Sequence, residues 1–256
     1  MNKDRWNHRF ELKPNCWVFV PTKASLIRGK EIKSEIELKW RTPYYYAHLK
    51  AGGHVTALKT HINNKYLIRT DIQNYFNSIN LTRITRELKP LFKPYNHARE
   101  IALESVVKNP NSSTNESILP FGFVQSPIIA SLCLYKSALG RYLHKLENKG
   151  FKVSVYMDDI IISTSEPYNT AETALIGLHE KARQSNFILN PDKTFGPVEQ
   201  ITAFNINLSK GSIEITEERL KEFKKEYQES NSEYVRNGIH SYINSVSLDQ
   251  GKSLLT

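Results

Sequence analysis

Two adjacent carboxylates, Asp158 and Asp159, lie between two apolar runs in residues 153–163. Valine, isoleucine and tyrosine favour strands and aspartate is depleted in them, so the pattern predicts a tight β-hairpin with both acids at its turn. Like charges at the tip of apolar strands repel each other unless a bound cation reverses the local electrostatics. The hairpin is therefore a candidate for half of a metal site; the alternative is a solvated acidic turn between two core strands.

A third carboxylate, Asp71, ends the strand-like run 66–72 in the same way. Carboxylates on neighbouring strands can share two Mg²⁺ ions about 3.5 to 4 Å apart, and such a pair suits in-line phosphoryl transfer. Mg²⁺ prefers few carboxylates together with substrate phosphates, so a sparse set of acids is sufficient. This chemistry requires elements that bring Asp71 to the acidic hairpin.

Residues 119–127 lead into the strongest helix signal of the chain. Ser126 can cap a helix, Pro127 suits the first helical position, and an apolar stripe as far as Leu143 predicts one long buried helix. Its start would offer free backbone N–H groups to a phosphate or sugar oxygen in a cleft. The alternative is a simple transition from loop to helix.

Lys39 and Arg41 flank Trp40 at the end of a strand that we expect over residues 35–40. Basic groups beside aromatic rings can hold phosphates and stack bases, whereas the alternative is ordinary surface charge. The remaining pattern predicts strands over residues 16–20, 187–190, 201–208 and 212–215, and helices over residues 54–63, 80–89, 97–108, 170–184 and 217–229.

The composition is that of a globular protein, with 256 residues, 39% of them hydrophobic, and a net charge of +9. This charge favours a polyanionic partner, such as a nucleic acid. No apolar run approaches the length of a membrane span, and the first eight residues lack the apolar core of a signal peptide, so we expect a cytoplasmic protein without a membrane partner. Cys16 and Cys133 fit reduced, buried thiols.

Four segments, in this order along the chain, resemble the reverse transcriptase family, in particular the bacterial branch with retron, group II intron and phage-defence enzymes. The most specific one is the sequence Tyr-Met-Asp-Asp at residues 156–159. The other three are residues 71–76, 119–127 and 190–194. The resemblance covers roughly residues 17–216 and implies RNA-directed DNA polymerase activity.

The resemblance assigns metal ligands to two of these segments. It implies that Asp71 and Asp158 are the principal ligands of two Mg²⁺ ions, or of Mn²⁺, and that Asp159 supports them. The backbone carbonyl of Ile72 would complete one metal site.

The resemblance also implies residues that contact the nucleotide. Phe76 would be a steric gate that lies under the sugar and excludes a 2′-hydroxyl, and its alternative role is that of a core aromatic. Lys193 would stand near the triphosphate and help to protonate the leaving pyrophosphate, unless it is a surface lysine of a turn. Gly122 and Gln125 would lie beside the nucleotide. Lys39 and Arg41 would grip triphosphate or template from the fingers.

The chain departs from the family pattern in two places. Phe121 stands where the family usually has glutamine, which removes a polar side chain expected near the incoming nucleotide or template base. Only residues 217–256 follow the matching region, which is short for the helical thumb that holds a primer–template duplex. We therefore expect an RNA, a protein partner or self-association to replace the missing grip.

The expected fold is α/β, a polymerase palm with a mostly antiparallel sheet and flanking helices. The expected regions are fingers over residues 1–65, a palm over 66–216 with fingers elements inserted around 80–118, and a thumb-like tail over 217–256. We expect a reverse transcriptase that uses deoxynucleoside triphosphates and an RNA template in a retron-like or antiviral system with a structured noncoding RNA. The alternatives are untemplated or protein-primed DNA synthesis, and a non-polymerising RNA-binding subunit.

Overall fold

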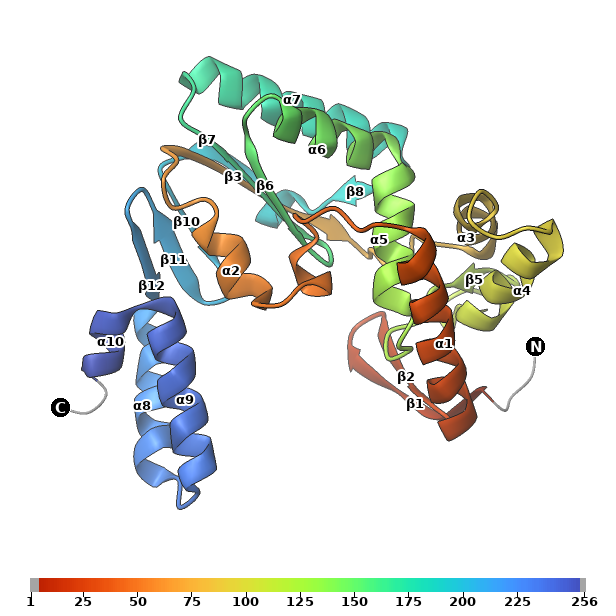
Figure 1. Ribbon diagram of the computed structural model, residues 1–256, viewed down its shortest axis with the longest axis horizontal. Helices are drawn as coiled ribbons and strands as arrows, with labels where there is room; N and C mark the ends of the chain where they lie inside the picture. The colour runs from red at the N-terminus through yellow and green to blue at the C-terminus, as the bar shows by residue number, and fades with distance from the viewer. Residues whose placement is uncertain (1–4, 254–256) are drawn as a thin grey trace.

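The computed structural model of the chain describes residues 5–253 (Figure 1). A five-stranded antiparallel sheet occupies its centre. Four strands follow the order β6-β7-β3-β8, and β9 pairs with β3 beside them. The strands are β3 (Tyr66–Gln73), β6 (Lys152–Tyr156), β7 (Asp159–Thr164), β8 (Ile188–Leu189) and β9 (Phe195–Val198). The predicted antiparallel palm sheet with flanking helices is confirmed.

Alternation along β7 divides the hydrophobic core between the two faces of the sheet. Ile160 and Ile162 belong to the larger core cluster, whereas Ile161, between them, belongs to a second cluster on the other face. This is the period of two that a strand buried on both faces produces. The larger cluster is covered by three helices, α5 (Ser126–Lys136), α6 (Ala138–Asn148) and α7 (Tyr168–Gln184). The second is covered by α2 (Gly53–Lys59) and the C-terminal elements.

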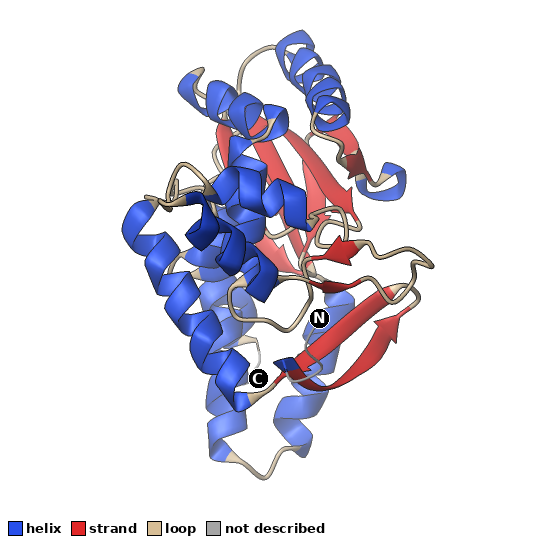
Figure 2. Cartoon of the chain, turned by 90° about the vertical axis from the view of Figure 1, so that its right-hand side faces the viewer, coloured by secondary structure: helices blue, strands red, loops and turns tan. Residues whose placement is uncertain are grey.

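The N-terminal elements lie beside the start of α5 (Figures 1 and 2). A two-stranded hairpin, β1–β2, is outside the central sheet and is joined to the loop before α5 by a backbone hydrogen bond of 3.0 Å from Phe19 N–H to the Phe121 carbonyl. These elements are β1 (Trp6–Lys13), β2 (Cys16–Pro21), α1 (Lys23–Lys39), α3 (Leu81–Leu88), α4 (Tyr95–Ser105), β4 (Val107–Lys108) and β5 (Ser117–Ile118).

The C-terminal part adds a small sheet and a helical bundle. It consists of β10 (Gln200–Ala203), β11 (Ile206–Ser209), β12 (Ser212–Ile215), α8 (Glu217–Glu229), α9 (Glu233–Val246) and α10 (Leu248–Lys252). Two short 3₁₀ helices, η2 (Ala47–Leu49) and η3 (Pro191–Lys193), flank the central sheet. Within residues 5–253 no helix combines the length and apolarity of a membrane span. The predicted fingers and thumb regions include residues 1–4 and 254–256, which lie outside the described part.

The strand expected over residues 35–40 is wrong, because these residues end helix α1. Its buried residues are Gly29, Ile32 and Ile36, and Trp40 follows four positions later. This spacing of three and four is helical, whereas Leu38, which an alternating strand would bury with Ile36, is 87% exposed.

The long helix expected after Pro127 is two helices, because Ser137 leaves the helical conformation and caps α6 through a hydrogen bond from Gly140 N–H. At its start, Gln125 and not Ser126 occupies the capping position, and it makes no side-chain cap bond. The strand expected over residues 201–208 is likewise two strands. Phe204 and Asn205 both adopt positive φ and form the tight turn between β10 and β11.

Candidate active site

The pairing of β3 with β7 brings the acids together. In this antiparallel register Asp71 lies directly opposite Asp159, and residues that face each other across two strands project to the same side. A backbone hydrogen bond of 3.0 Å from Ile72 N–H to the Asp158 carbonyl ties β3 to the turn between β6 and β7. Met157 takes a left-handed φ of 58° in this turn and so directs Asp158 toward Asp71.

Carboxylate oxygens of Asp71, Asp158 and Asp159 all lie within 4.8 Å of one another. Asp71 is 5% exposed and the other two are half-buried. Three carboxylate donors this close together fit hard divalent cations, which take carboxylate, carbonyl and water ligands. Ile72 lines the same hollow as Asp71 and Asp158. The donor set therefore fits the divalent ions that the sequence leads us to expect.

Burial raises the pKa of Asp158 to about 6, and the charges of Asp71 and Asp159 add to this effect. Within the described residues, the nearby cations are shared unevenly among the acids. Arg69 pairs with Asp159 at 2.9 Å, and Lys193 pairs with Asp71 at 3.1 Å. Asp158 has no such ion pair, so a cation or a proton at this position relieves its repulsion from the other two carboxylates.

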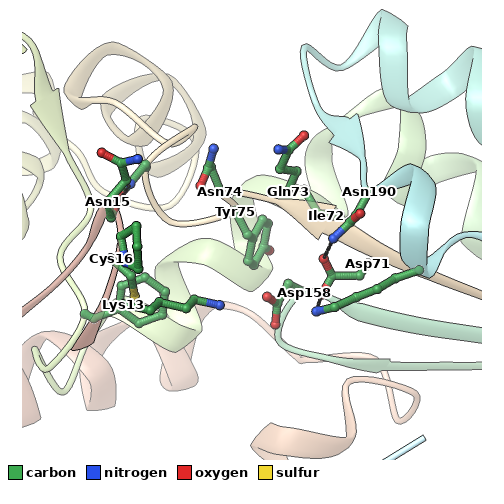
Figure 3. Close-up of a pocket in the computed structure, with 14 residues that line it drawn as sticks. Lys13, Asn15, Cys16, Asp71, Ile72, Gln73, Asn74, Tyr75, Asp158 and Asn190 are labelled. Carbon is green, nitrogen blue, oxygen red and sulfur yellow. Dashed lines mark hydrogen bonds and ion pairs between the residues drawn. The ribbon is translucent and has the colours of Figure 1, made fainter. Parts of the chain in front are cut away.

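Asp71 is held by two side chains from the segment after β8. Lys193 Nζ donates to Asp71 Oδ2 over 3.1 Å, and Asn190 Nδ2 approaches Asp71 Oδ1 at 3.4 Å (Figure 3). η3 sets the position of both groups, because Asn190 caps it through a hydrogen bond from Asp192 N–H. Lys193 thus lies beside the acids, and Asn190 is a site residue to which the sequence analysis assigns no role.

The turn between β1 and β2 forms the opposite wall of a hollow of about 130 Å³ that contains Asp71 and Asp158. Lys13, Asn15 and Cys16 line it, and Lys13 extends toward Asp158 (Figure 3). The sequence predicts the second strand of this hairpin, residues 16–20, but not the first. Its signal is the spacing of Trp6, Phe10 and Leu12 at even positions, followed by a Pro-Asn turn in which Asn15 takes positive φ.

A second hollow of about 310 Å³ lies between the acidic turn and the start of α5, and Asp158 lines both hollows. Phe76 and Phe121 lie in its wall with ring centroids 4.4 Å apart, next to Gly122 and Met157. Gly122 has φ of 98°, and a Cβ there would come within 2.2 Å of the Phe19 carbonyl oxygen. Glycine is therefore required where this loop crosses β2.

Three other predicted nucleotide contacts lie elsewhere. Gln125 is buried at the start of α5, where its amide nitrogen approaches Ser105 Oγ, and it does not line either hollow. Lys39 lies at the end of α1 with its ammonium group over the ring of Phe92. Arg41 is exposed just beyond it. Neither Lys39 nor Arg41 lines the hollows at the acids.

His48, to which the sequence assigns no role, fixes the acidic turn through its imidazole. Its Nδ1 accepts a 3.0 Å hydrogen bond from Met157 N–H, and its Nε2 lies 2.8 Å from Ser131 Oγ. Ser131 Oγ in turn donates to the Pro127 carbonyl, so the imidazole donates from Nε2 and is neutral. Burial lowers the pKa of His48 to about 4, which maintains this state at neutral pH.

A palm-type sheet with three acids at the junction of β3 and a β-hairpin defines a nucleotide-polymerising class of protein. The family model described as reverse transcriptase (RNA-dependent DNA polymerase) matches residues 25–234, and the chain belongs to this family. The predicted family is thereby confirmed.

A curated bacterial protein is similar to part of the chain. The chain is 27% identical over 111 residues to the Retron Ec48 reverse transcriptase of Escherichia coli, a match that covers 43% of this chain and 25% of that protein. The chain thus spans about a quarter of the length of this curated relative.

Two solved structures share the fold. Telomerase from Candida albicans, in complex with a fragment of telomeric RNA, matches with a TM-score of 0.57 and 14% identity, over 91% of this chain and 47% of that one. The foamy viral protease–reverse transcriptase in complex with double-stranded DNA matches with a TM-score of 0.51 and 16% identity, over 91% of this chain and 34% of that one.

Proposed function

We propose that the chain is an RNA-directed DNA polymerase that adds deoxynucleotides to a 3′-hydroxyl with two Mg²⁺ ions, which Mn²⁺ can replace. The observation that carries this proposal is the convergence of Asp71, Asp158 and Asp159 within 4.8 Å in a chain of this family. When bound, the two metal ions would supply Lewis acidity to the attacking and leaving oxygens of an in-line displacement. Asp71 and Asp158 are the principal ligands in this proposal, with support from Asp159 and the Ile72 carbonyl.

In this proposal the two hollows beside Asp158 hold different parts of the nucleotide. Lys193 and Lys13 line the polar hollow, where their ammonium groups would meet the triphosphate, and Lys193 would protonate the leaving pyrophosphate. Phe76 and Gly122 line the more apolar hollow, where the sugar and base would lie. In this arrangement the Phe76 ring selects deoxyribose by excluding a 2′-hydroxyl.

The experiment is extension of a labelled DNA primer on a defined RNA template with Mg²⁺. We expect Asp158→Asn to lower the rate roughly 10²- to 10³-fold, because it removes a charged ligand while it keeps the side-chain shape. The matched control is Asp249→Asn, which removes an exposed carboxylate on α10 and should leave the rate unchanged. Equal rates for wild type and Asp158→Asn would refute the proposal.

Phe121 favours a second candidate, untemplated or protein-primed DNA synthesis. Its ring stacks on Phe76 where the family usually has a polar glutamine, so this position offers no hydrogen bond to a base or template. Reactions without RNA, and reactions with single nucleotides, separate the candidates. Product whose sequence follows the added RNA rules out untemplated synthesis, whereas nucleotide incorporation without RNA supports it. RNA binding without synthesis by wild-type protein supports a non-polymerising subunit.

The partner in this proposal is a structured noncoding RNA, in a retron-like or antiviral system, as the similarity to a retron enzyme suggests. Sequencing of nucleic acids that copurify with wild-type protein and with Asp158→Asn tests this partner. We expect one RNA with both proteins, and DNA complementary to it with wild type alone. Random cellular RNA with both proteins would refute a dedicated partner.

A further inference from the structure

A trough runs between α6 and α7, on the side of these helices that does not pack on the central sheet. It consists of two adjoining hollows of about 470 and 270 Å³ that share Tyr142 and Lys145 in their walls. The helices lie side by side along the top of the molecule in Figure 1. We call this feature the α6–α7 trough. The residues that line it and that matter below are Arg141, Lys145, Lys149, Asn169, Thr170 and Thr173.

The wall that α6 contributes carries three unpaired positive charges. Arg141, Lys145 and Lys149 are exposed and follow one another at intervals of four residues, so they form one row along the helix. Across residues 5–253, no carboxylate forms an ion pair with any of the three, and no aspartate or glutamate lines the trough. The fourth basic residue of the lining, Lys181, is paired with Glu180 at 3.0 Å.

Helix stability accounts for part of this row. Lys145 in the last turn of α6 and Lys149 at its C-cap complement the negative end of the helix dipole, whereas Arg141 lies near the positive end and like charges four residues apart disfavour the helix. Packing does not account for the row, because α6 contacts the core through Leu139, Leu143 and Leu146. All three cations line the trough without a carboxylate partner among residues 5–253, so an anion in the trough would be attracted to each of them.

The trough is separate from the candidate active site. Phe151 lies in its wall and begins the segment that continues as β6 and ends at the acidic turn. The six extended steps from Phe151 to Met157 correspond to roughly 20 Å at about 3.3 Å per residue. An anion in the trough therefore does not occupy the hollows beside Asp158.

We propose that the α6–α7 trough binds the phosphate backbone of an RNA segment that lies outside the catalytic cleft. The opposite wall supports this choice of anion, because Asn169 and Thr170 present amide and hydroxyl groups that can bind phosphate and 2′-hydroxyl oxygens, whereas the Thr173 hydroxyl donates to the Asn169 carbonyl. The concave shape admits a strand and not a flat lipid surface. The inference rests on the proposed function only in naming RNA as the nucleic acid.

The test is the salt dependence of RNA binding, measured without nucleotides or divalent ions. Each phosphate contact on a single strand contributes about 0.7 to the slope of log K against log salt concentration. We expect Arg141→Gln/Lys145→Gln/Lys149→Gln to lower this slope by about 2 and to weaken binding at low salt. The matched control, Lys59→Gln/Lys210→Gln/Lys221→Gln, removes three exposed charges elsewhere and should change the slope by much less.

Two readouts complete the design. Crosslinks from 4-thiouridine RNA should map to residues 138–149, and the trough variant should extend a short primer–template pair at the wild-type rate. Equal slopes for the trough and control variants, or crosslinks confined to other segments, would overturn the inference. Because binding is measured without synthesis, a protein that does not polymerise still gives a result for the trough.

Discussion

Phe76 contacts both the hydrophobic core and the cavity beside Asp158. It is 4% exposed, packs against Tyr75 and Phe121, and lines the hollow at the acidic turn. The two roles that the sequence leaves open, steric gate and core aromatic, are thus compatible with one position. The two roles predict different effects of a smaller side chain on sugar selectivity.

We expect Phe76→Leu to reduce discrimination against ribonucleotides roughly 10- to 100-fold, because the shorter side chain leaves room for a 2′-hydroxyl. The measurement is the ratio of kcat/KM for deoxy- and ribonucleoside triphosphates. The control is Phe92→Leu, which shortens an equally buried phenylalanine away from the acids. Unchanged sugar selectivity in both variants would leave Phe76 as a core residue alone.

The convergence of the acids could be predicted from residue types, whereas the positions of the basic residues could not. Asp71 and Asp158 interrupt apolar strands, and few roles other than cation binding suit carboxylates there. Lys39 and Arg41 carry no such constraint, since a lysine on a helix end is stable with or without a ligand. Lys13 reaches the site only through the β1–β2 hairpin, so its position depends on a tertiary contact that local pattern does not encode.

Three elements meet at His48. It lies in η2, accepts a hydrogen bond from the β6–β7 turn at Met157, and contacts Ser131 in α5. Pro127, which binds the Ser131 hydroxyl, lines the hollow next to Asp158. The imidazole therefore connects the acidic turn with helix α5, whose first turn lines the hollow next to Asp158.

We expect His48→Phe to lower kcat roughly 10-fold while KM for the nucleotide changes less, because Met157 N–H loses its acceptor and the turn shifts. A buried N–H without a partner costs about 1–3 kcal/mol, and this range includes the roughly 1.4 kcal/mol that corresponds to a tenfold effect. His48→Gln should recover part of kcat, since its amide oxygen can accept. The control is His54→Phe, which also contacts the Tyr156 ring but makes no hydrogen bond to the turn. Equal kcat for wild type and His48→Phe would contradict this role.

Element boundaries are predictable where a side chain acts locally. Asn80 caps α3 as the sequence suggests, and its side chain accepts from Arg83 N–H. The break at Ser137 depends instead on Gly140, whose missing side chain lets α6 approach the last turn of α5 at the Leu134 carbonyl. An apolar stripe that continues across such a junction gives no sign of it.

Across the whole molecule, buried histidines make stability depend on pH. His61 is fully buried between the hydroxyl groups of Ser154 and Ser163, and burial lowers its pKa to about 3. The imidazole stays neutral in the folded state while the unfolded chain takes up a proton below its ordinary pKa of 6.5. This contribution to stability is complete above pH 6.5 and is lost as the pH falls from 6.5 toward 3.

We expect the difference in unfolding free energy between wild type and His61→Gln to shrink by roughly 2 kcal/mol between pH 7 and pH 5. Only wild type loses the His61 contribution, whereas other titrating groups act on both proteins alike. Urea denaturation at several pH values measures the difference. A gap that stays constant or widens toward pH 5 would show that His61 is protonated in the folded protein.

The palm is the part of the molecule that sequence predicts best, because its alternating strands and amphipathic helices are each buried against one sheet. The placement of the N-terminal hairpin is the least predictable, since it depends on tertiary contacts such as the hydrogen bonds from Phe19 N–H to the Phe121 carbonyl and from Trp17 Nε1 to Asn111 Oδ1. Both contacts join segments about a hundred residues apart.

Phe121 contacts both the N-terminal hairpin and the wall of the cavity. Its carbonyl accepts a hydrogen bond from Phe19 N–H in β2, and its ring packs against the ring of Phe76. Phe121 also lines both hollows beside Asp158. A substitution at this one position would therefore alter the hairpin side and the Phe76 side of the cavity together, and in the proposed arrangement it would affect the binding of the triphosphate and of the sugar at once.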